Sequence, residues 1–318
     1  MNKVAIIDMG TNTFHLLLAQ RDGTGRYNII FRDRIAVKIG KGGINDGHIT
    51  AEGMDRAVLA MQSFKKTIDD HIIENITAVG TSALRSASNG DEVLEKIKSA
   101  TGIEPKTILG DLEAEYIYLG VRYGLEMANE KSLIIDIGGG SVEFIIADKN
   151  HIYWKKSLEI GAQRLLEKFH KHDPILPGEI NRLNSYFSEK LIELFDALQT
   201  HPTKNLIGAS GSFDTLSDIY CFRNSISKDE NDAETPLTLE AFYAIAEEII
   251  AKNRSQRMAI PGMIEMRVDM IVVSCCLIKY ILSRHPFDRI RVSSYSLKEG
   301  VLASLTKTVN TIELNLPK

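Results

Sequence analysis

The sequence contains few cysteines, and their arrangement excludes two classes of protein. Cys221, Cys275 and Cys276 are odd in number and two of them are adjacent, so they offer neither a disulfide framework nor the spacing of metal ligands. Such a chain suits a reducing compartment, and we expect a cytoplasmic protein.

Long apolar runs and a strong charge of either sign are also missing. No run approaches the roughly 20 apolar residues that a membrane-spanning helix needs, since the longest, residues 270–278, contains Ser274 and is followed by Lys279. Residues 4–8 predict a buried strand rather than a signal peptide, because a charged residue follows closely. The 38 Lys and Arg against 42 Asp and Glu leave a net charge of −4, which excludes a protein that coats nucleic acid. We expect no membrane and no nucleic-acid partner, and at most a small anionic ligand in one local site.

The overall composition, with 44% hydrophobic and 25% charged residues, is that of an ordinary soluble globular protein. A length of 318 residues is too great for one core of usual size and suits two. Strand-like segments alternate with longer helical patterns, which predicts an α/β protein. The expected strands are residues 4–8, 14–20, 27–39, 76–80, 106–109, 133–136, 142–147, 152–158, 205–208 and 289–292. The expected helices are residues 51–70, 90–100, 112–126, 162–169, 177–198, 239–251, 263–283 and 297–306, with another starting at Gly211 and a loop over 223–235.

An internal repeat divides the chain. Residues 6–19 align with residues 134–147, and in both copies a strand runs into an Asp-x-Gly turn and out into a second strand. The aligned aspartates, Asp8 and Asp136, are 128 positions apart. We therefore predict two related domains, residues 1–126 and 127–318, that face each other across a ligand-binding cleft. The last helix is free to return toward the first domain.

The turns of the two hairpins are suited to binding phosphate. Glycines let backbone N–H groups approach a phosphate closely, and hydroxyl groups add donors. Neither turn opens a helix, so these are not Walker loops or dinucleotide fingerprints. A plain hairpin turn explains one such segment, but two equivalent turns, each preceded by a buried aspartate, favour phosphate binding. The predicted phosphate-binding residues are Gly10, Thr11, Asn12 and Thr13 in the first turn and Gly138, Gly139, Gly140 and Ser141 in the second.

Three carboxylates near these turns are candidate ligands of a divalent cation. Asp8 and Asp136 end apolar strands, where a carboxylate is costly unless it is paired or binds a metal. Glu143 lies inside an apolar strand, and alternation points it toward the same mouth as Ser141. Capping of a turn by the aspartates and a solvated strand face for the glutamate are the alternatives. We expect Asp136, Glu143 and Asp8 to bind Mg²⁺, or Mn²⁺ in its place.

Two strand-to-helix junctions carry further polar groups. Thr81, Ser82 and Arg85 follow the strand at residues 76–80 and are suited to an anion, because helix N-termini and guanidinium groups both favour phosphate oxygens. N-capping by Ser82 is the alternative. After the strand at residues 205–208, a second junction repeats these small and hydroxyl residues, and its predicted phosphate-binding members are Gly208, Ser210 and Gly211.

The remaining charged groups give weaker signals. Glu113 and Glu115 open a predicted helix, where acidic residues stabilise the helix dipole, so periodicity alone does not mark a general base. The histidines, His15 among them, show neither metal-ligand nor triad spacing, and we interpret them as structural or surface groups.

Taken in order, these segments resemble the exopolyphosphatase and guanosine pentaphosphate phosphohydrolase family, within the actin–hexokinase–Hsp70-like superfold. The resemblance runs from residue 6 to residue 302, and it rests on the two turns, the junction segments and the motifs at residues 110–114, 157–165, 267–271 and 297–302. It implies two related actin/hexokinase-like (ribonuclease H-like) domains, with mixed sheets flanked by helices and the active site in the interdomain cleft. The chain resembles the short form of the family, without additional C-terminal helical domains.

The resemblance implies hydrolysis of the terminal phosphoanhydride of polyphosphate, or of guanosine pentaphosphate. The family's catalytic glutamate falls on Glu113, which would activate water as a general base. Asp136 and Glu143 would hold Mg²⁺, and the two turns together with Arg85 would grip the phosphates of a polyanionic substrate from opposite domains. A homodimer is left open.

Two residues depart from the family pattern. Leu112 replaces the first glutamate of the usual pair, and Lys298 stands where arginine is usual. The apolar side chain of Leu112 is expected to lie beside Glu113 and to raise the pKa of its carboxyl group. Two other functions stay open at this point: an ATP-dependent kinase or ATPase of the same superfold, and a catalytically weak sensor that binds polyphosphate or an alarmone.

Overall fold

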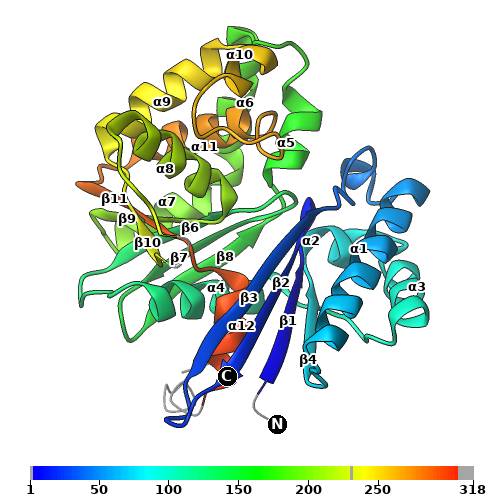
Figure 1. Cartoon of the computed structure of the whole chain (residues 1–318). Coiled ribbons are helices and arrows are strands. Elements are labelled where there is room, and N and C mark those ends of the chain that lie inside the picture. Colours follow the sequence, from blue (N-terminus) through cyan, green and yellow to red (C-terminus); the bar gives the residue numbers. More distant parts are fainter. Residues whose placement is uncertain (1–2, 230–231, 307–318) are drawn as a thin grey trace.

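The computed structural model describes residues 3–229 and 232–306. Within these ranges the chain forms two lobes, each built on a mixed β-sheet with helices packed against it (Figure 1). The first sheet has five strands in the order β3–β2–β1–β4–β5. Its strands are β1 Lys3–Met9, β2 Thr13–Arg21, β3 Tyr27–Ala36, β4 Ile76–Gly80 and β5 Lys106–Thr107. β1, β2 and β3 are antiparallel neighbours, while β4 runs parallel to β1 and to β5.

The second sheet repeats this pattern on a larger scale. It has six strands in the order β10–β11–β9–β6–β7–β8. These are β6 Ser132–Ile137, β7 Val142–Ala147, β8 Ile152–Leu158, β9 Asn205–Ala209, β10 Glu234–Thr235 and β11 Arg289–Ser293. β6, β7 and β8 are antiparallel, and β9 runs parallel to β6. The predicted α/β class, with two mixed sheets flanked by helices, is therefore confirmed.

The two hairpins that the sequence repeat predicted occupy equivalent places. In the first sheet Asp8 of β1 pairs with His15 of β2, and in the second sheet Asp136 of β6 pairs with Glu143 of β7. Every residue of β6 and β7 is buried, because apolar side chains pack on both faces of these strands. A continuous apolar run is typical of strands covered on both sides.

Helices cover the first sheet on one side. These are α1 Ala51–Asp70, α2 Ser82–Ser86 and α3 Gly90–Thr101, preceded by the 3₁₀ turn η1 Ile44–Asp46. Thr50 caps α1 by accepting a hydrogen bond of 3.1 Å from the N–H of Gly53. The apolar face of α1, with Met61, Phe64 and Ile68, packs into the same core as the inner face of the sheet. This is the amphipathic pattern expected from the sequence.

The second lobe carries more helices. They are α5 Ala162–Phe169, α6 Pro177–Lys190, α7 Ile192–Thr200, α8 Gly211–Asn224, α9 Leu239–Ala251, α10 Arg254–Met258 and α11 Ile271–Arg284. α11 is buried along most of its length and contacts α5, α6 and α9. A helix that is apolar on nearly all sides belongs in the middle of a core, and α11 forms the centre of this one.

Two helices join the lobes. α4 (Gly110–Gly124) and α12 (Leu297–Ser304) lie side by side at the junction (Figure 1). α4 packs on β7 and β8 of the second sheet, whereas α12 reaches β1 of the first. The helices touch where Gly120 meets Gly300: a Cβ on Gly300 would lie 1.6 Å from the carbonyl oxygen of Tyr116. Only glycine allows this approach, so the glycine contact sets how the two helices are placed.

Several boundaries differ from the predicted ones. Residues 177–198 form two helices rather than one, separated at Leu191. The helix predicted over residues 263–283 starts only at Ile271, and residues 265–270 before it are turns. The strand predicted over 27–39 ends at Ala36, and the predicted loop 223–235 contains β10. In the part of the chain that the structure describes, no helix is long and apolar enough to cross a membrane.

Candidate active site

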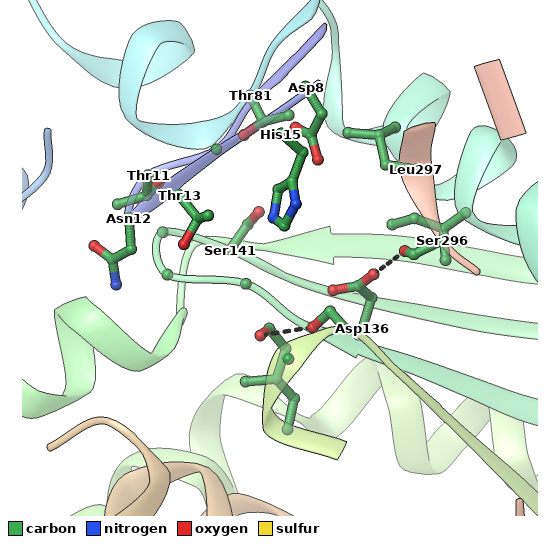
Figure 2. Close-up of a pocket in the computed structure, with 18 of the residues that line it drawn as sticks. Asp8, Thr11, Asn12, Thr13, His15, Thr81, Asp136, Ser141, Ser296 and Leu297 are labelled. Carbon is green, nitrogen blue, oxygen red and sulfur yellow. Dashed lines mark hydrogen bonds between the residues drawn. The ribbon is translucent and has the colours of Figure 1, made fainter. Parts of the chain in front are cut away.

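The two glycine-rich turns meet across a cavity of about 120 Å³ between the lobes. The cavity is lined by 14 of the 16 predicted site residues; the other two are Arg85 and Gly208. Figure 2 shows Asp8 and His15 on one side of the cavity and Asp136 with Ser296 on the other. Residues that are far apart in the sequence, from the first strand to the start of the last helix, therefore converge on one point.

Close backbone packing explains the glycines of the second turn. A Cβ on Gly140 would lie 2.3 Å from Oγ of Ser82 and 2.5 Å from Oγ1 of Thr11. A Cβ on Gly139 would lie 2.8 Å from Nδ2 of Asn12. The turns from the two lobes thus touch each other, and a larger residue at Gly139 or Gly140 would separate them.

Two polar atoms of the first turn have no hydrogen-bond partner among the residues that the structure describes. Oγ1 of Thr11 and Oδ1 of Asn12 are buried and make no hydrogen bond among the described residues. Thr13 donates its hydroxyl hydrogen to the sulfur of Met266 at 3.3 Å, a weak acceptor. Buried polar atoms without partners are rare in folded proteins, and at this place they are suited to a polar ligand.

Ser210 connects β9 to α8 in a conformation that is unusual for its type. Its φ of 68° with ψ of 175° lies in a region occupied almost only by glycine. Its hydroxyl group donates to the carbonyl oxygen of Ile137 at 3.1 Å. Gly211 follows, and the guanidinium of Arg267 lies against it, since a Cβ there would be 2.1 Å from Nη2. Strain of this kind is typical of ligand-binding sites.

Five carboxylates line the cavity, the four that the sequence predicted and Asp214, and burial opposes the charge of each. Burial raises the pKa of Asp8 to about 7, and the negative charge of Asp136 adds to the effect while Lys298 opposes it. Burial raises the pKa of Asp136 as well, although Ser296 donates a hydrogen bond to its Oδ2. The pKa of Glu143 is raised well above its ordinary value by burial and by the charges of Glu113 and Asp136.

The fourth carboxylate is Glu113, in the first turn of α4. Its Oε2 accepts a hydrogen bond of 2.8 Å from Nη1 of Arg85. Burial nevertheless raises the pKa of Glu113 to about 8, against the opposing charge of Arg85. The prediction that apolar contact with Leu112 raises the pKa of Glu113 is wrong, because Leu112 is 36% exposed and does not line the cavity. The packing of α4 between the lobes buries Glu113 instead.

Two predicted phosphate-binding residues lie outside the cavity lining. Arg85 forms ion pairs with Glu113 at 2.8 Å and with Glu159 at 2.9 Å. Gly208 is part of β9, and a Cβ there would lie 2.0 Å from the ring of Phe213, so packing accounts for this glycine. For both residues a direct phosphate contact stays a sequence-based prediction that this arrangement does not support.

Sequence reasoning missed a group of charged residues that line the cavity. They are His15, Arg34, Asp214, Arg267 and Lys298, with Ser296 beside Asp136. In the sequence, Lys298 stands out only as a departure from a motif, and the spacing of His15 predicts a structural or surface group. His15 instead reaches the cavity, and burial together with the cations Lys298, Arg267 and Arg34 holds its pKa well below the usual value. One signal in the sequence could have placed His15 at the cavity: in the predicted hairpin it lies opposite Asp8.

The oxygen donors of the cavity fit a magnesium ion that the protein coordinates only in part. No group of three or more His, Cys, Asp or Glu side chains among the described residues is arranged to hold a metal by itself. Mg²⁺, however, usually binds one or two carboxylates and completes its octahedron with water and substrate phosphates. Asp136 and Glu143 pair across the hairpin, with Asp8 on the same cavity, so hard oxygen ligands with excess negative charge are present.

Comparisons with known proteins agree with this geometry. A model described as the Ppx/GppA phosphatase family matches residues 18–309. The chain is similar to an exopolyphosphatase from Cytophaga hutchinsonii of known structure, with a TM-score of 0.92 and 42% identity over 95% of this chain and 97% of that one. It is also similar to a Ppx/GppA family member from Aquifex aeolicus, with a TM-score of 0.78 and 26% identity over 95% and 97% of the chains.

The chain is also similar to part of a longer protein. The guanosine-5'-triphosphate,3'-diphosphate pyrophosphatase of Pseudoalteromonas translucida is 28% identical over 313 residues. The matched region is 98% of this chain but only 61% of that protein.

Proposed function

The chain belongs to the Ppx/GppA phosphatase family, and from this we propose that it hydrolyses the terminal phosphoanhydride bond of inorganic polyphosphate or of guanosine pentaphosphate. The observation that carries the proposal is one interdomain cavity that two glycine-rich turns line together with five carboxylates. The turns suit phosphate oxygens, and the carboxylates suit a cation and a water molecule. Phosphoanhydride hydrolysis needs these components and little else from a protein.

Glu113 is the proposed general base. In this step a water oxygen attacks the terminal phosphorus, the bond from phosphorus to the bridging oxygen breaks, and that oxygen leaves with the electron pair on the shortened substrate. The proton of the water passes to the carboxylate of Glu113. Glu113 faces the cavity from the first turn of α4, and its pKa of about 8 lies near the working range that a general base needs.

The phosphate oxygens are assigned to groups from both lobes. Backbone N–H groups of the two turns, the hydroxyl groups of Thr11, Thr13 and Ser141, and the N-terminal end of α8 all border the cavity. Arg267 and Lys298 add positive charge, and Nε of Arg267 is buried without a partner among the described residues. Fixed donors of this kind stabilise charge that develops on the transferring group without reorganisation.

Asp136 and Glu143, with Asp8, would hold the Mg²⁺. When bound, the cation supplies neutralisation of the charge on the phosphate oxygens. The negative charge of Asp136 helps to raise the pKa of both Asp8 and Glu143, and this repulsion supports the assignment, because a divalent cation would relieve it.

The substrate class follows from the names of the relatives, one an exopolyphosphatase and one a guanosine-5'-triphosphate,3'-diphosphate pyrophosphatase. Both substrates end in a phosphoanhydride-linked phosphate. Leu112 does not argue for an inactive sensor, because it lies outside the cavity lining and removes no group from it.

The test is a phosphate-release assay in Mg²⁺, run in parallel on polyphosphate of defined length and on guanosine pentaphosphate. ATP with a panel of sugars serves as the control for a kinase. We expect release of orthophosphate from at least one of the two substrates and none from ATP. Consumption of ATP with transfer to a sugar, and no release from either proposed substrate, would refute the proposal.

A further inference from the structure

Arg85 connects the candidate base to the opposite lobe. Its Nη1 donates to Oε2 of Glu113 at 2.8 Å and to the carbonyl oxygen of Ile108 at 2.9 Å. Its Nη2 donates to Oε1 of Glu159 at 2.9 Å. Arg85 belongs to α2 of the first lobe, while Glu159 follows β8 of the second. One guanidinium is therefore shared between the candidate base and a carboxylate across the cleft.

Glu159 is itself held from several directions. Oε2 accepts hydrogen bonds from the hydroxyl group of Ser82 and from Nη2 of Arg164, the latter at 2.8 Å. Arg164 also donates to the carbonyl oxygens of Gly140 at 2.9 Å and of Ile44 at 2.6 Å, and so spans both lobes. We call Glu159, Ser82, Arg85 and Arg164 the Glu159 cluster. Ser82 and Arg85 come from the first lobe and Glu159 and Arg164 from the second, so the cluster bridges the two lobes.

We propose that Glu159 is a positioning residue for the hydrolysis proposed above, on which this inference rests: from the second lobe it holds Arg85 against Glu113 and so orients the base. Arg85 then acts on Glu113 and not on a substrate phosphate. The planar guanidinium can serve both carboxylates at once with its two terminal nitrogens, a geometry that a lysine cannot reproduce.

The two roles of Arg85 predict opposite effects of Glu159→Gln. If Arg85 positions Glu113, loss of the Glu159 charge loosens Arg85 and misplaces the base, so kcat falls about tenfold to a hundredfold with KM changed by less than about twofold. If Arg85 instead binds phosphate, loss of its competitor Glu159 frees it, and KM falls while kcat is kept. The second result would overturn the proposal.

A double-mutant cycle tests the route of action. In an Arg85→Ala background, Glu159→Gln is expected to lower kcat by no further factor, because Glu159 acts through Arg85. Fully multiplicative losses in kcat would contradict this. Glu167→Gln is the matched control: Glu167 also reaches the first lobe, where it accepts from the N–H of Gly42 at 2.9 Å, but it does not touch Arg85. Its kcat is expected to stay within about twofold of wild type; an equal loss in both variants would mean that Glu159 is only a tether between lobes.

A third measurement needs no activity and separates this inference from the proposed function. The melting temperatures of wild type, Arg85→Ala, Glu159→Gln and the double variant are compared in ligand-free protein. We expect the double variant to melt no lower than the less stable single variant. Additive losses would overturn the proposal, because they would show that the two side chains do not interact. A wild-type protein that releases phosphate from neither substrate refutes the proposed function, whether or not the coupling is found.

Discussion

At the scale of single residues, Glu113 and Glu115 provide a matched pair. Both lie in the first turns of α4, but Glu113 faces the cavity while Glu115 is ion-paired with Lys155. Glu113→Gln is expected to lower kcat by about 10²–10⁴-fold with substrate binding retained, the usual loss of a general base. Single-turnover rates at saturating substrate check this, with Glu115→Gln as the control. Equal, small effects of the two changes would remove the assignment of Glu113.

Glu143 permits a test that separates function from stability. Its pKa is raised by burial and by neighbouring charges, so the folded protein has to keep a proton that the unfolded chain loses at neutral pH. Glu143→Gln is therefore expected to abolish phosphate release in Mg²⁺ but to raise the melting temperature of the metal-free protein at pH 8. A gain of about 1 kcal/mol corresponds to roughly 2–4 °C. Calorimetry and a Mg²⁺ titration measure the two effects; wild-type turnover would refute the metal assignment, and a lower melting temperature would refute the charge argument.

At the scale of elements, the contact of α4 with α12 is the feature that places groups from both lobes on one cavity. α4 carries Glu113 and α12 begins at the residues that follow Ser296. A methyl group on Gly300 would meet the backbone of Tyr116, which cannot move aside. Gly300→Ala is expected to destabilise the protein by about 1–3 kcal/mol and to lower kcat, because the helices must separate.

Gly178 is the control for this prediction. It lies in the first turn of α6, and in the described part of the chain no atom outside its own helix and its chain neighbours lies within 4 Å of the position that its Cβ would take. Gly178→Ala is therefore expected to be neutral or to stabilise by about 0.5–1 kcal/mol, the difference in helix propensity. Urea unfolding of both variants gives the comparison. If Gly300→Ala were as harmless as Gly178→Ala, close packing of the two helices would not be what aligns the site.

At the scale of the whole molecule, the cavity carboxylates make stability depend on pH. Burial raises the pKa of Asp8 to about 7, of Asp214 to about 6 and of Glu113 to about 8. A raised carboxyl pKa means that the folded state keeps protons that the unfolded state loses, so stability falls as pH rises from about 4 toward 8. His15, whose pKa is lowered, has the opposite effect, but only up to its unfolded pKa of about 6.5.

The melting temperature of the metal-free protein is accordingly expected to fall between pH 6.5 and pH 8. Saturating Mg²⁺ together with orthophosphate should reduce this loss, because a bound cation stabilises the charged carboxylates. Scanning calorimetry at three pH values, with and without Mg²⁺ and phosphate, measures it. A melting temperature that rises over this range without ligand would contradict the assigned burial of the cavity carboxylates.

The sequence by itself determined the features that depend on neighbours along the chain. The hairpin of residues 6–19, its copy at 134–147 and the carboxylates at their mouths could be read directly, because alternation and turn chemistry are local. Most predicted turn and carboxylate residues line the cavity for the same reason. The resemblance added Glu113, which periodicity alone would have left as a helix-capping residue.

Only the tertiary structure decided which distant groups meet. Arg267 and Asp214 reach the cavity because α11 starts late and α8 begins at a strained serine, and neither fact has a strong local signal. Arg85 was predicted to bind phosphate because its neighbours suit an anion. In the folded chain it is paired with Glu113 and Glu159 and does not line the cavity, since α4 and the segment after β8 bring these two carboxylates to it. Charge interactions are set by distance in space, and spacing along the chain does not determine that distance.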